Sequence, residues 1–519
     1  MDIAIIGGGL IGSRVLRSLI NHEKFNENFH IDVYEKRPEL SKGMPHIKDT
    51  DTKVINTRVS GMSTDFSNEN GFQNYIDEHS ATAYSVEGLV KREAFGDYLE
   101  QSFSKDFSHA QVEVIRADVE DIEVLIDKAK SDARYKLYSR EVLQNEAADL
   151  AESLQADNEA QSEAVSESLN EKIYDAIFLC IGHPVYRDDY KLNGQDKFIR
   201  NIYPMETKLA NIKQKDRVAI IGTGASSLDA YRYFQFEKSL DHKLYFCTLD
   251  EGFQIPALEV KSDKNLQSTV DWEWIEERRS SGEGLIDLDE LIKTVQTDLD
   301  RLGLNQMAKF KELTPFTMDK LDKVIKNDDQ ELAELIEYFY SFYDLDADIF
   351  AALSGSDRDR YLAKYEKPYW RFRGTGPVET LSRVVDSYAV GDIEVIYNTK
   401  DIKPNEDGSF NIYSEEGDVV TVDYVLNTAG FDLTIKENAK YNKLLRNLYD
   451  KNIIKSDVQG KYIDLDWPNH RILSKRYGCL NNAFVLGVWA GGTQYKNIDG
   501  RRLMRMADRV ATGFMDDLE

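Results

Sequence analysis

Six residues near the start of the chain, Gly7 to Gly12, follow the spacing Gly-x-Gly-x-x-Gly, the pattern of a turn that binds a dinucleotide pyrophosphate. Gly7 permits a tight turn, Gly9 lets a phosphate approach the backbone, and Gly12 lets a helix pack closely on a strand. Leu10 and Ile11 begin the helix, whose first N–H groups and positive dipole end attract phosphates. The chemistry predicted here is the binding of a dinucleotide.

The elements needed to hold such a turn flank it in the right order. An apolar β-forming run at 2–6 precedes the glycines, a helical stretch at 13–20 follows, and a second strand at 30–34 ends at Glu35. Glu35 lies 23 residues after Gly12, where a carboxylate accepts hydrogen bonds from a ribose diol. We assign Lys36 to the same site. The alternative is a glycine-rich turn in an unrelated α/β protein.

The same pattern occurs a second time. A strand at 217–221 leads into a turn whose third glycine is replaced by Ser227, which is small enough for close packing. A strand at 243–249 then ends at Asp250, again 23 residues later. Two dinucleotide sites in one chain predict a flavin, FAD, and a nicotinamide dinucleotide, NADH or NADPH. The turn residues assigned to the second site are Gly222, Thr223, Gly224, Ser226 and Ser227.

Three residues are candidates for chemistry beside the cofactors. The apolar run 174–182 reads as a central parallel strand that ends at Gly182 and His183, so His183 either caps the strand or lies near the flavin ring. Arg371 and Arg373 are expected on one side of an extended segment, where they bind a phosphate or a carboxylate, or form surface ion pairs.

Other residues are assigned to cofactor binding by their place in the chain. The polar loop 36–57 is too long for a simple turn, and we expect it to wrap a ligand. An amphipathic helix starts with basic residues near 92, and a closing strand, loop and helix follow 483. The assigned residues are Asn56, Thr57, Arg92, Val119, Gly182, Gly430 and Gly487.

These elements predict an α/β fold with two Rossmann-like dinucleotide-binding domains. We expect the FAD domain to be discontinuous, at 1–204 and 386–519, with the NAD(P) domain inserted at 205–385. Helical periodicity dominates 260–365, which we expect to be an extra helical block and a substrate lid. An acidic stretch at 141–171 reads as a helix inserted at a hairpin turn, either a solvated excursion or a partner-binding arm.

Composition narrows the class of protein. The 519 residues carry 65 Lys and Arg against 92 Asp and Glu, a net charge of −27, which disfavours nucleic acid and anionic membranes as partners. No apolar stretch approaches the length of a membrane span, and no signal peptide is apparent. The three cysteines form no C-x-x-C pair, so we expect no disulfide scaffold, no metal site and a cytoplasmic location.

The chain resembles two-dinucleotide-domain flavoproteins related to flavin-dependent amine N-hydroxylases. The resemblance is carried by 3–12 with Glu35, 54–57, 92–99, 178–184, 220–227 and 423–431, and it excludes the insert 141–171. The family's Ala-Thr-Gly-Tyr run appears here as 428–431, with Thr and Ala in reversed order. An arginine after the second nucleotide strand commonly meets the NADPH 2′-phosphate in such relatives. This chain has Asp250 there, which favours NADH.

The resemblance implies an FAD-dependent monooxygenase that takes electrons from NAD(P)H and passes one atom of O₂ to a small substrate, an amine or amino acid. An NAD(P)H-dependent flavin reductase or oxidase is the first alternative. A non-catalytic dinucleotide-binding regulatory protein is the second. Substrate identity and oligomeric state stay open at this point.

Overall fold

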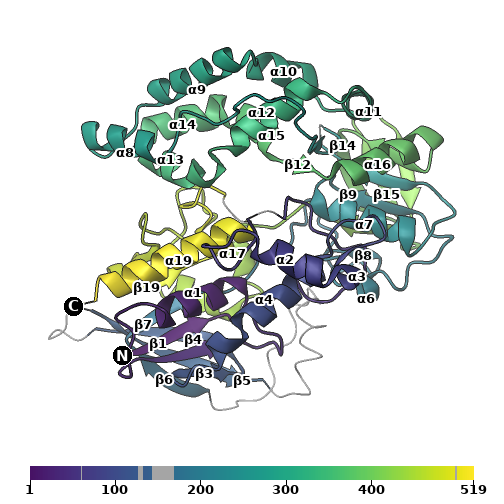
Figure 1. The fold of residues 1–519 in the computed structure, drawn as a ribbon. Coiled ribbons are helices and arrows are strands. Elements are labelled where there is room, and N and C mark those ends of the chain that lie inside the picture. The colour runs from purple at the N-terminus through teal and green to yellow at the C-terminus, as the bar shows by residue number, and fades with distance from the viewer. Residues whose placement is uncertain (60, 127–131, 143–168, 250, 497–498, 519) are drawn as a thin grey trace.

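The computed structural model describes residues 1–59, 61–126, 132–142, 169–249, 251–496 and 499–518. It contains two mainly parallel sheets with helices packed on them, and a helical block that lies at the top in Figure 1. The predicted α/β fold with two dinucleotide-type units is confirmed.

The first sheet has the strand order β18-β19-β7-β1-β2-β3, and only β18 runs antiparallel to its neighbour. Successive residues of β1 point to opposite faces. Ile3 and Ile5 pack against helices α1 and α19, whereas Ala4 and Ile6 face the antiparallel sheet β4-β5-β6. These elements, with the α4 helix, form the first unit. The strands are β1 (Asp2–Ile6), β2 (His30–Tyr34), β3 (Val112–Ile115), β4 (Ala117–Leu125), β5 (Arg134–Glu141), β6 (Asn170–Tyr174), β7 (Ala176–Leu179), β18 (Arg471–Ser474) and β19 (Gly478–Val485).

Helices of the first unit cover both faces of this sheet: one group lies above β1 in Figure 1, and the other packs with the antiparallel sheet on the opposite face. The terminal helix α19 packs along α1, and α4 packs on α1 and β3. They are α1 (Leu10–Ile20), α2 (Gly71–Glu78), α3 (Ser80–Ala83), α4 (Arg92–Phe107), α17 (Ile435–Asn438), α18 (Lys443–Asp450), the 3₁₀ turn η2 (Val488–Ala490) and α19 (Gly500–Asp516).

The second sheet is parallel throughout, in the order β13-β10-β9-β17-β8. Helices α7 and α16 cover it, and an antiparallel sheet, β14-β15-β16, precedes β17. We call these elements the second unit. They are β8 (Phe198–Ile199), α6 (Met205–Lys208), β9 (Val218–Ile221), α7 (Ala225–Phe236), β10 (Leu244–Cys247), α16 (Val378–Val390), β13 (Ile393–Ile396), β14 (Thr399–Pro404), β15 (Phe410–Ser414), β16 (Val419–Val422) and β17 (Tyr424–Asn427).

The two units repeat one topology. Strands β7-β1-β2-β3 correspond to β17-β9-β10-β13, and in each unit a three-stranded antiparallel sheet leads into the strand beside the glycine turn. The hydrogen bonds at the strand ends also correspond. Gly7 N–H donates to the carbonyl of Tyr34 at 2.9 Å, and Gly222 N–H donates to that of Cys247 at 2.8 Å. The duplication therefore extends well beyond the glycine patterns.

Sheet membership corrects the predicted domain boundaries. β8 lies before residue 205, and β13 and β17 lie after residue 385, yet all three hydrogen-bond within the second sheet. The second unit therefore spans 198–427. The prediction assigned β17 to the first sheet. Buried parallel strands of both units are continuous apolar runs, so the sequence of a strand does not indicate which sheet it joins.

The predicted helical block is confirmed between β10 and β13, and the pair β11–β12 closes its base. The stripe Leu288, Leu291, Leu299 and Leu302 lies in the core that the block shares with the second sheet, as expected for a helix with one apolar face. Its elements are β11 (Ile255–Pro256), α8 (Trp272–Ser281), α9 (Leu288–Leu302), α10 (Gln306–Leu313), α11 (Met318–Asn327), α12 (Gln330–Tyr340), the 3₁₀ turn η1 (Tyr343–Leu345), α13 (Asp346–Ala352), α14 (Gly355–Lys364), α15 (Glu366–Arg373) and β12 (Thr375–Gly376).

The acidic insert joins β5 to β6, and these strands pair antiparallel, Tyr135 opposite Tyr174. The insertion at a hairpin is therefore confirmed, while the predicted helix itself falls in 143–168, outside the described residues. Among the described helices, none has the length and apolar character needed to cross a bilayer.

Candidate functional site

The first glycine turn lies at the carboxyl end of β1, where β1 passes into α1. Gly7 has φ +107°, and a Cβ there would stand 2.1 Å from the carbonyl oxygen of Cys180. A Cβ at Gly12 would stand 1.9 Å from the Gly7 oxygen. Gly9 occupies the cap position of α1 with no side-chain cap, so the turn leaves first-turn N–H groups of α1 to a ligand. The roles predicted for Gly7 and Gly12 are those the backbone requires.

Glu35 follows the last residue of β2 and reaches back to the turn. Its carboxylate oxygens accept N–H bonds from Gly8 and Arg37, both at 2.9 Å. These two bonds fix the carboxylate at the strand end, beside the glycine turn. The side chain therefore stands where the ribose of a dinucleotide meets the strand end in this type of fold.

The loop after Glu35 passes over the turn. Ser41 N–H donates to the Gly8 carbonyl at 2.8 Å, and Gly43 lies 3.4 Å from the Cβ position of Gly9. Lys36 forms an ion pair with Asp118 at 3.2 Å, and Val119 is buried in β4 beside it. The loop thus covers one side of the first glycine turn, as a segment expected to wrap a ligand there would.

The second turn repeats the geometry of the first. Gly222 has φ +102°, and the cap Gly224 has φ −87° and ψ −164°, against φ −75° and ψ −166° at Gly9. Neither cap carries a side-chain hydrogen bond. Ser227 replaces the third glycine without disturbing the turn, because its hydroxyl donates to the Gly224 carbonyl at 2.6 Å. Thr223 Oγ1 donates to the Gly252 carbonyl at 2.8 Å, and Ser226 lies in the first turn of α7.

The structure corrects the predicted counterpart of Glu35. Glu35 N–H bonds the carbonyl of Ile115 at 3.1 Å, and Thr248 N–H bonds that of Ile396 at 3.0 Å, each at the first position after its strand. Thr248 is therefore the structural equivalent, although Asp250 matches in sequence spacing. Asp250 itself lies outside the described residues. The spacing misled because the segment from α7 to the end of β10 is two residues shorter than its counterpart.

The two sheets present their carboxyl ends to a shared junction. Two chain segments connect the units, and they pair there: Arg187 N–H donates to Gly430 at 3.0 Å, and Asp432 N–H to Val185 at 2.8 Å. Gly182 and Gly430 adopt φ +79° and +89° beside this pairing. The exposed ring of His183 stacks on Phe431 with centroids 5.0 Å apart. His183 thus lies beside the pairing that connects the units, four residues after β7, and its role as a strand cap or as a neighbour of the flavin ring stays a prediction.

Gly487, at the end of β19, has φ +91° and starts the loop toward α19. The start of α19 comes close to the first turn, since a Cβ at Gly500 would lie 3.3 Å from Leu10. Two separated parts of the chain therefore border the first glycine turn.

The prediction for Arg371 and Arg373 is corrected. They lie on helix α15 rather than on an extended segment, and two residues on a helix point to different sides. Arg371 pairs with Glu251, and Lys367 lies 3.9 Å from the same carboxylate. Arg373 instead turns to Asp346 and Tyr369. The run Tyr-Trp-Arg-Phe-Arg was predicted to be extended because it shows no clear helical periodicity, but it belongs to a short helix with one buried face.

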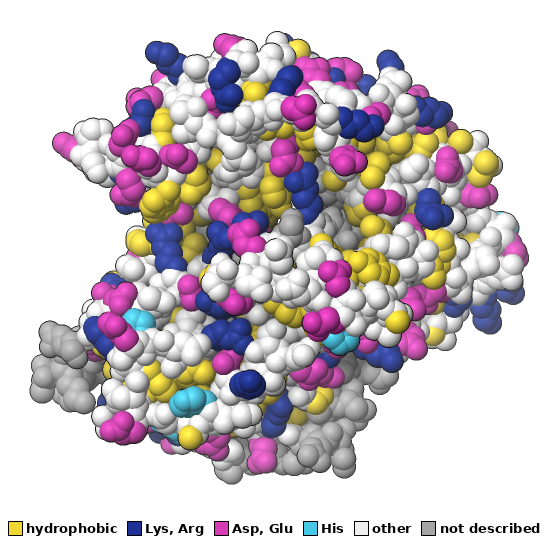
Figure 2. All heavy atoms as spheres, viewed as in Figure 1, with side chains coloured by type: hydrophobic (Ala, Val, Ile, Leu, Met, Phe, Trp, Pro, Cys, Tyr) yellow, Lys and Arg dark blue, Asp and Glu magenta, His cyan; other side chains and the backbone are white. Residues whose placement is uncertain are grey.

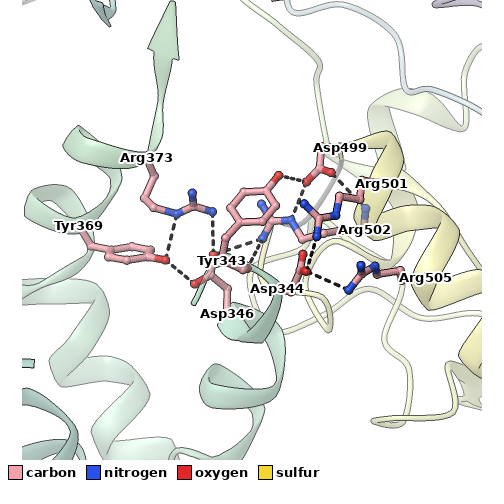
Figure 3. Close-up of polar contacts among 9 residues, drawn as sticks. All are labelled: Tyr343, Asp344, Asp346, Tyr369, Arg373, Asp499, Arg501, Arg502 and Arg505. Carbon is pink, nitrogen blue, oxygen red and sulfur yellow. Dashed lines mark hydrogen bonds and ion pairs between the residues drawn. The ribbon is translucent and has the colours of Figure 1, made fainter. Parts of the chain in front are cut away.

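Figure 3 shows the side chains that surround Arg373. Its guanidinium lies 3.9 Å from the ring centre of Tyr343, and that of Arg502 on α19 lies 3.4 Å from the same ring. Asp346 accepts from both arginines at 3.2 Å. This cluster joins the helical block to the first unit.

The space-filling view shows the surface hollowed between the helical block above and the first unit below, with Lys and Arg side chains in the recess (Figure 2). A cavity of about 730 Å³ opens where three parts of the chain meet. The first unit contributes Arg58 and the helical block contributes Glu337, which pair at 2.7 Å. The second unit contributes Glu379, at the start of α16.

Two residues predicted to bind a cofactor contact the second unit. Arg92 pairs with Asp229 of α7 at 2.6 Å, and the Asn56 oxygen accepts from Arg232 at 2.8 Å. Thr57 is exposed. Sequence reasoning missed Asp229 and Arg232; a buried charge pair three residues apart in the pyrophosphate helix was the available signal.

Comparison with known proteins gives two results. A family model described as FAD-NAD(P)-binding matches residues 4–131, which contain the first glycine turn and Glu35. No curated protein matches the chain by sequence.

Solved structures resemble the chain over its full length. The reduced ornithine hydroxylase from Pseudomonas aeruginosa is 11% identical, with 100% of this chain and 99% of that chain covered and a TM-score of 0.57. The cadaverine monooxygenase of desferrioxamine biosynthesis from Erwinia amylovora, bound to FAD, is 11% identical, with coverage of 100% and 94% and a TM-score of 0.58. The ornithine N-hydroxylase from Kutzneria sp. 744, with reduced FAD, NADP⁺ and L-ornithine, is 12% identical, with coverage of 99% and 98% and a TM-score of 0.56. The predicted resemblance to flavin-dependent N-hydroxylases is confirmed as a shared fold.

Proposed function

We propose that this chain is an FAD-dependent monooxygenase that takes electrons from a nicotinamide dinucleotide and hydroxylates a small amine with O₂. The single observation that carries the proposal is the pair of glycine turns with matching backbone angles, at Gly7 to Gly12 and Gly222 to Ser227. The full-length likeness to ornithine and cadaverine hydroxylases supports it.

The first unit suits FAD. Gly9 leaves the start of α1 uncapped for the pyrophosphate, and Glu35 is held at the strand end for the ribose. Bound there, a flavin supplies the transfer of electrons from nicotinamide to O₂. The residues of this chain orient the two nucleotides and limit the access of water. His183, stacked on Phe431 between the units, borders the same junction.

The second unit suits a nicotinamide dinucleotide, and we propose NADPH. The expectation of NADH relied on a carboxylate at the ribose, but Thr248 occupies the position after β10. Glu251 is neutralised by Arg371, with Lys367 nearby at 3.9 Å. Positive side chains beside the strand end favour a 2′-phosphate over a free diol.

The substrate site we propose is the cavity of about 730 Å³. Both of its cationic side chains are paired, Arg58 with Glu337 and Lys264 with Glu334 at 2.8 Å. Within the described residues no ion pair involves Glu259 or Glu379, which also line the cavity. The excess charge of the cavity is therefore negative, which favours an amine.

A cytoplasmic location and the lack of nucleic-acid or membrane partners stay proposals. The support is the net charge of −27 and the three free cysteines.

The test uses the purified full-length protein. An absorption spectrum establishes whether FAD is bound, and anaerobic mixing with NADPH or NADH shows which one bleaches it. Aerobic turnover with diamines and basic amino acids then separates the alternatives. Hydroxylamine formed in step with NADPH consumption supports the proposal. Peroxide release without hydroxylated product indicates a reductase or oxidase, and a protein that binds no flavin indicates a regulatory role.

A further inference from the structure

A buried group of charged side chains joins the nucleotide helix α7 to the first unit. Asp229 and Arg232 lie one turn apart on α7 and pair with each other at 2.9 Å. Asp229 also forms an ion pair with Arg92 of the first unit at 2.6 Å. Arg232 forms an ion pair with Glu87 of the first unit at 2.9 Å. Each unit thus presents one cation and one anion to the other. Asn56 bridges them, since its oxygen accepts from Arg232 at 2.8 Å.

Three of these four charged side chains are buried, and that of Arg92 is 17% exposed. The side chains of Asp229 and Arg232 are 0% exposed and that of Glu87 is 1% exposed. Further side chains contact the group: Tyr203 OH donates to Asp229 at 2.5 Å, and Arg383 of α16 forms an ion pair with Glu87 at 3.1 Å. The two Glu87 oxygens are held by ion pairs and form no hydrogen bond within the described residues. Burial raises the pKa of the Glu87 carboxyl, while the two arginines oppose that rise.

Buried charges tolerate few arrangements. A rotation of one unit against the other would separate Arg92 from Asp229 and Glu87 from Arg232. Asp229 and Arg232 would then keep only each other among these four charges, and a buried charge that loses a partner is costly. In some proteins, buried polar or charged pairs select one arrangement of the packed elements, and the network at this interface has the pairing needed for that role.

The same helix holds the second glycine turn. Asp229 lies four residues after Ala225, the first residue of α7, which is roughly 6 Å along the helix. Because α7 is a continuous helix, whatever fixes Asp229 and Arg232 also fixes the turn at Gly222 to Ser227.

We propose that Arg92 and Asp229 are positioning residues. Their network with Glu87 and Arg232 holds the second unit in one orientation, so that a nicotinamide bound at the second turn meets the flavin site in one geometry. This assigns Arg92 to the interface between the units rather than to the cofactor. The inference rests on the proposed function, since a positioning role requires both nucleotides.

The experiment compares full-length variants with the parent protein. Asp229→Asn and Arg92→Met each remove one charge from the network with little change in volume, and Glu87→Gln tests the other pair. Arg92→Lys restores the charge without the forked geometry. The matched control is Lys243→Met, which breaks an ion pair with Glu394 at 2.9 Å inside the second unit, where both side chains are over 40% exposed.

Two measurements are made. Hydrogen exchange, followed without added nucleotide, reports the interface through peptides covering 84–92 and 225–236. Anaerobic bleaching of bound flavin at saturating NADPH reports alignment, since a hydride must pass from the nicotinamide to the oxidised flavin, which leaves NADP⁺ and reduced flavin.

We expect Asp229→Asn and Arg92→Met to exchange faster in both peptides and to bleach at least tenfold more slowly per bound flavin. In these two variants the NADPH concentration that gives the half-maximal bleaching rate changes less than threefold. Arg92→Lys recovers part of the bleaching rate. Lys243→Met matches the parent protein in both exchange and bleaching. Parental bleaching despite faster exchange overturns the inference, as does unchanged exchange in both peptides. A parent protein that NADPH does not bleach at all overturns the proposed function instead, and the positioning role with it.

Discussion

Glu35 and Thr248 occupy the same position in the two nucleotide-binding units. Each follows the last residue of the second strand, and each N–H bonds the carbonyl that ends the neighbouring strand, Ile115 or Ile396, at 3.1 and 3.0 Å. One unit therefore offers a carboxylate at this position and the other a hydroxyl. Since this side chain faces the ribose in folds of this type, the two positions would offer a ribose different hydrogen-bonding groups.

Glu35→Gln is expected to weaken FAD binding about 10- to 100-fold. The carboxylate accepts two backbone N–H bonds, and an amide would turn a donor toward one of them. Charge-assisted hydrogen bonds contribute about 1.5–3 kcal/mol, and about 1.4 kcal/mol corresponds to tenfold in affinity. Fluorescence titration of the flavin-free protein with FAD measures the loss. Glu113→Gln, on β3, is the control, and equal affinity in both variants would contradict the assignment.

Thr248→Glu and Arg371→Ala are expected to change the choice of nicotinamide in the same direction. The first adds a carboxylate at the ribose, and the second removes the cation that neutralises Glu251. Both place negative charge where NADPH carries its 2′-phosphate. We expect KM for NADPH to rise about tenfold, since one lost ionic hydrogen bond is of that order, while KM for NADH changes little.

Steady-state rates with both nucleotides measure this change. Arg360→Ala is the control, because Arg360 pairs with exposed Asp289 on the surface of the helical block. A parallel loss with NADPH and NADH would show that Arg371 acts through folding rather than through the phosphate.

The sequence identified the elements whose patterns are local. Strand β2 and the turns at Gly7 and Gly222 lie where expected, because apolar alternation and glycine spacing reflect backbone geometry directly. Sheet membership was misassigned for β17, since hydrogen-bond partners far apart in the chain leave no local pattern.

The parts of the candidate site that depend on a local pattern were also predicted correctly, and the parts that depend on distant segments were not. The glycine spacing located both turns, although Ser227 replaces the third glycine of the second. The count of 23 residues to position 250 overshot the end of β10, because a shorter connection places Thr248 first after the strand. Arg371 and Arg373 lie on a helix whose aromatic composition gave no clear periodicity. In the network around Asp229, only the spacing of Asp229 and Arg232 is local; their partners Arg92 and Glu87 come from a segment over a hundred residues away, which no local pattern indicates.

Alanine at Gly12 and at Gly224 is expected to separate folding from nucleotide binding. A Cβ at Gly12 would stand 1.9 Å from the Gly7 oxygen, so the helix and strand must separate, at about 3 kcal/mol. No described atom lies within 4 Å of a Cβ at Gly224, where φ is −87°, so stability changes by less than about 0.5 kcal/mol.

The methyl group at residue 224 would nevertheless stand where the pyrophosphate approaches the start of α7. Thermal unfolding and NADPH titration are measured on both variants. A stable Gly224→Ala protein that binds NADPH normally would refute the second turn as a pyrophosphate site.

Stability is expected to fall below pH 6.5 partly through His470. Its side chain is fully buried, and burial lowers the pKa of the ring to about 3. Below pH 6.5 the unfolded chain takes up a proton that the folded chain refuses. As the pH falls from 6.5 to about 3, the free energy of unfolding therefore declines by up to about 1.4 kcal/mol per pH unit. Above pH 6.5 this loss is absent, because the histidine is neutral in both the folded and the unfolded chain.

His470→Asn removes this titration and keeps a residue that tolerates the backbone φ of +59°. Its stability is lower at neutral pH but depends less steeply on pH between 6.5 and 4. Denaturant unfolding at several pH values measures the two slopes. His242→Asn, at an exposed position, keeps the parental slope; identical slopes for the parent and His470→Asn would contradict the assignment.

Asp346→Asn is expected to release the helical block from the terminal helix. Asp346 is the carboxylate shared by Arg373 and Arg502, and its side chain is 3% exposed (Figure 3). An amide there leaves two buried guanidinium groups beside the Tyr343 ring with too little negative charge. Removing one partner of a buried ion pair costs about 3–5 kcal/mol. Since the cluster joins α13 and α15 to α19, that cost falls on the contact between the block and the first unit.

Hydrogen exchange over 343–352 and 500–516 measures the release, and both segments are expected to exchange faster together. Asp289→Asn is the control, since it removes a carboxylate from an exposed pair with Arg360 in the same block. If Asp346→Asn lowered the melting temperature while exchange rose only in 343–352, the carboxylate would stabilise the block internally. Faster exchange in both segments requires that the charges of α19 and of the block hold each other in place.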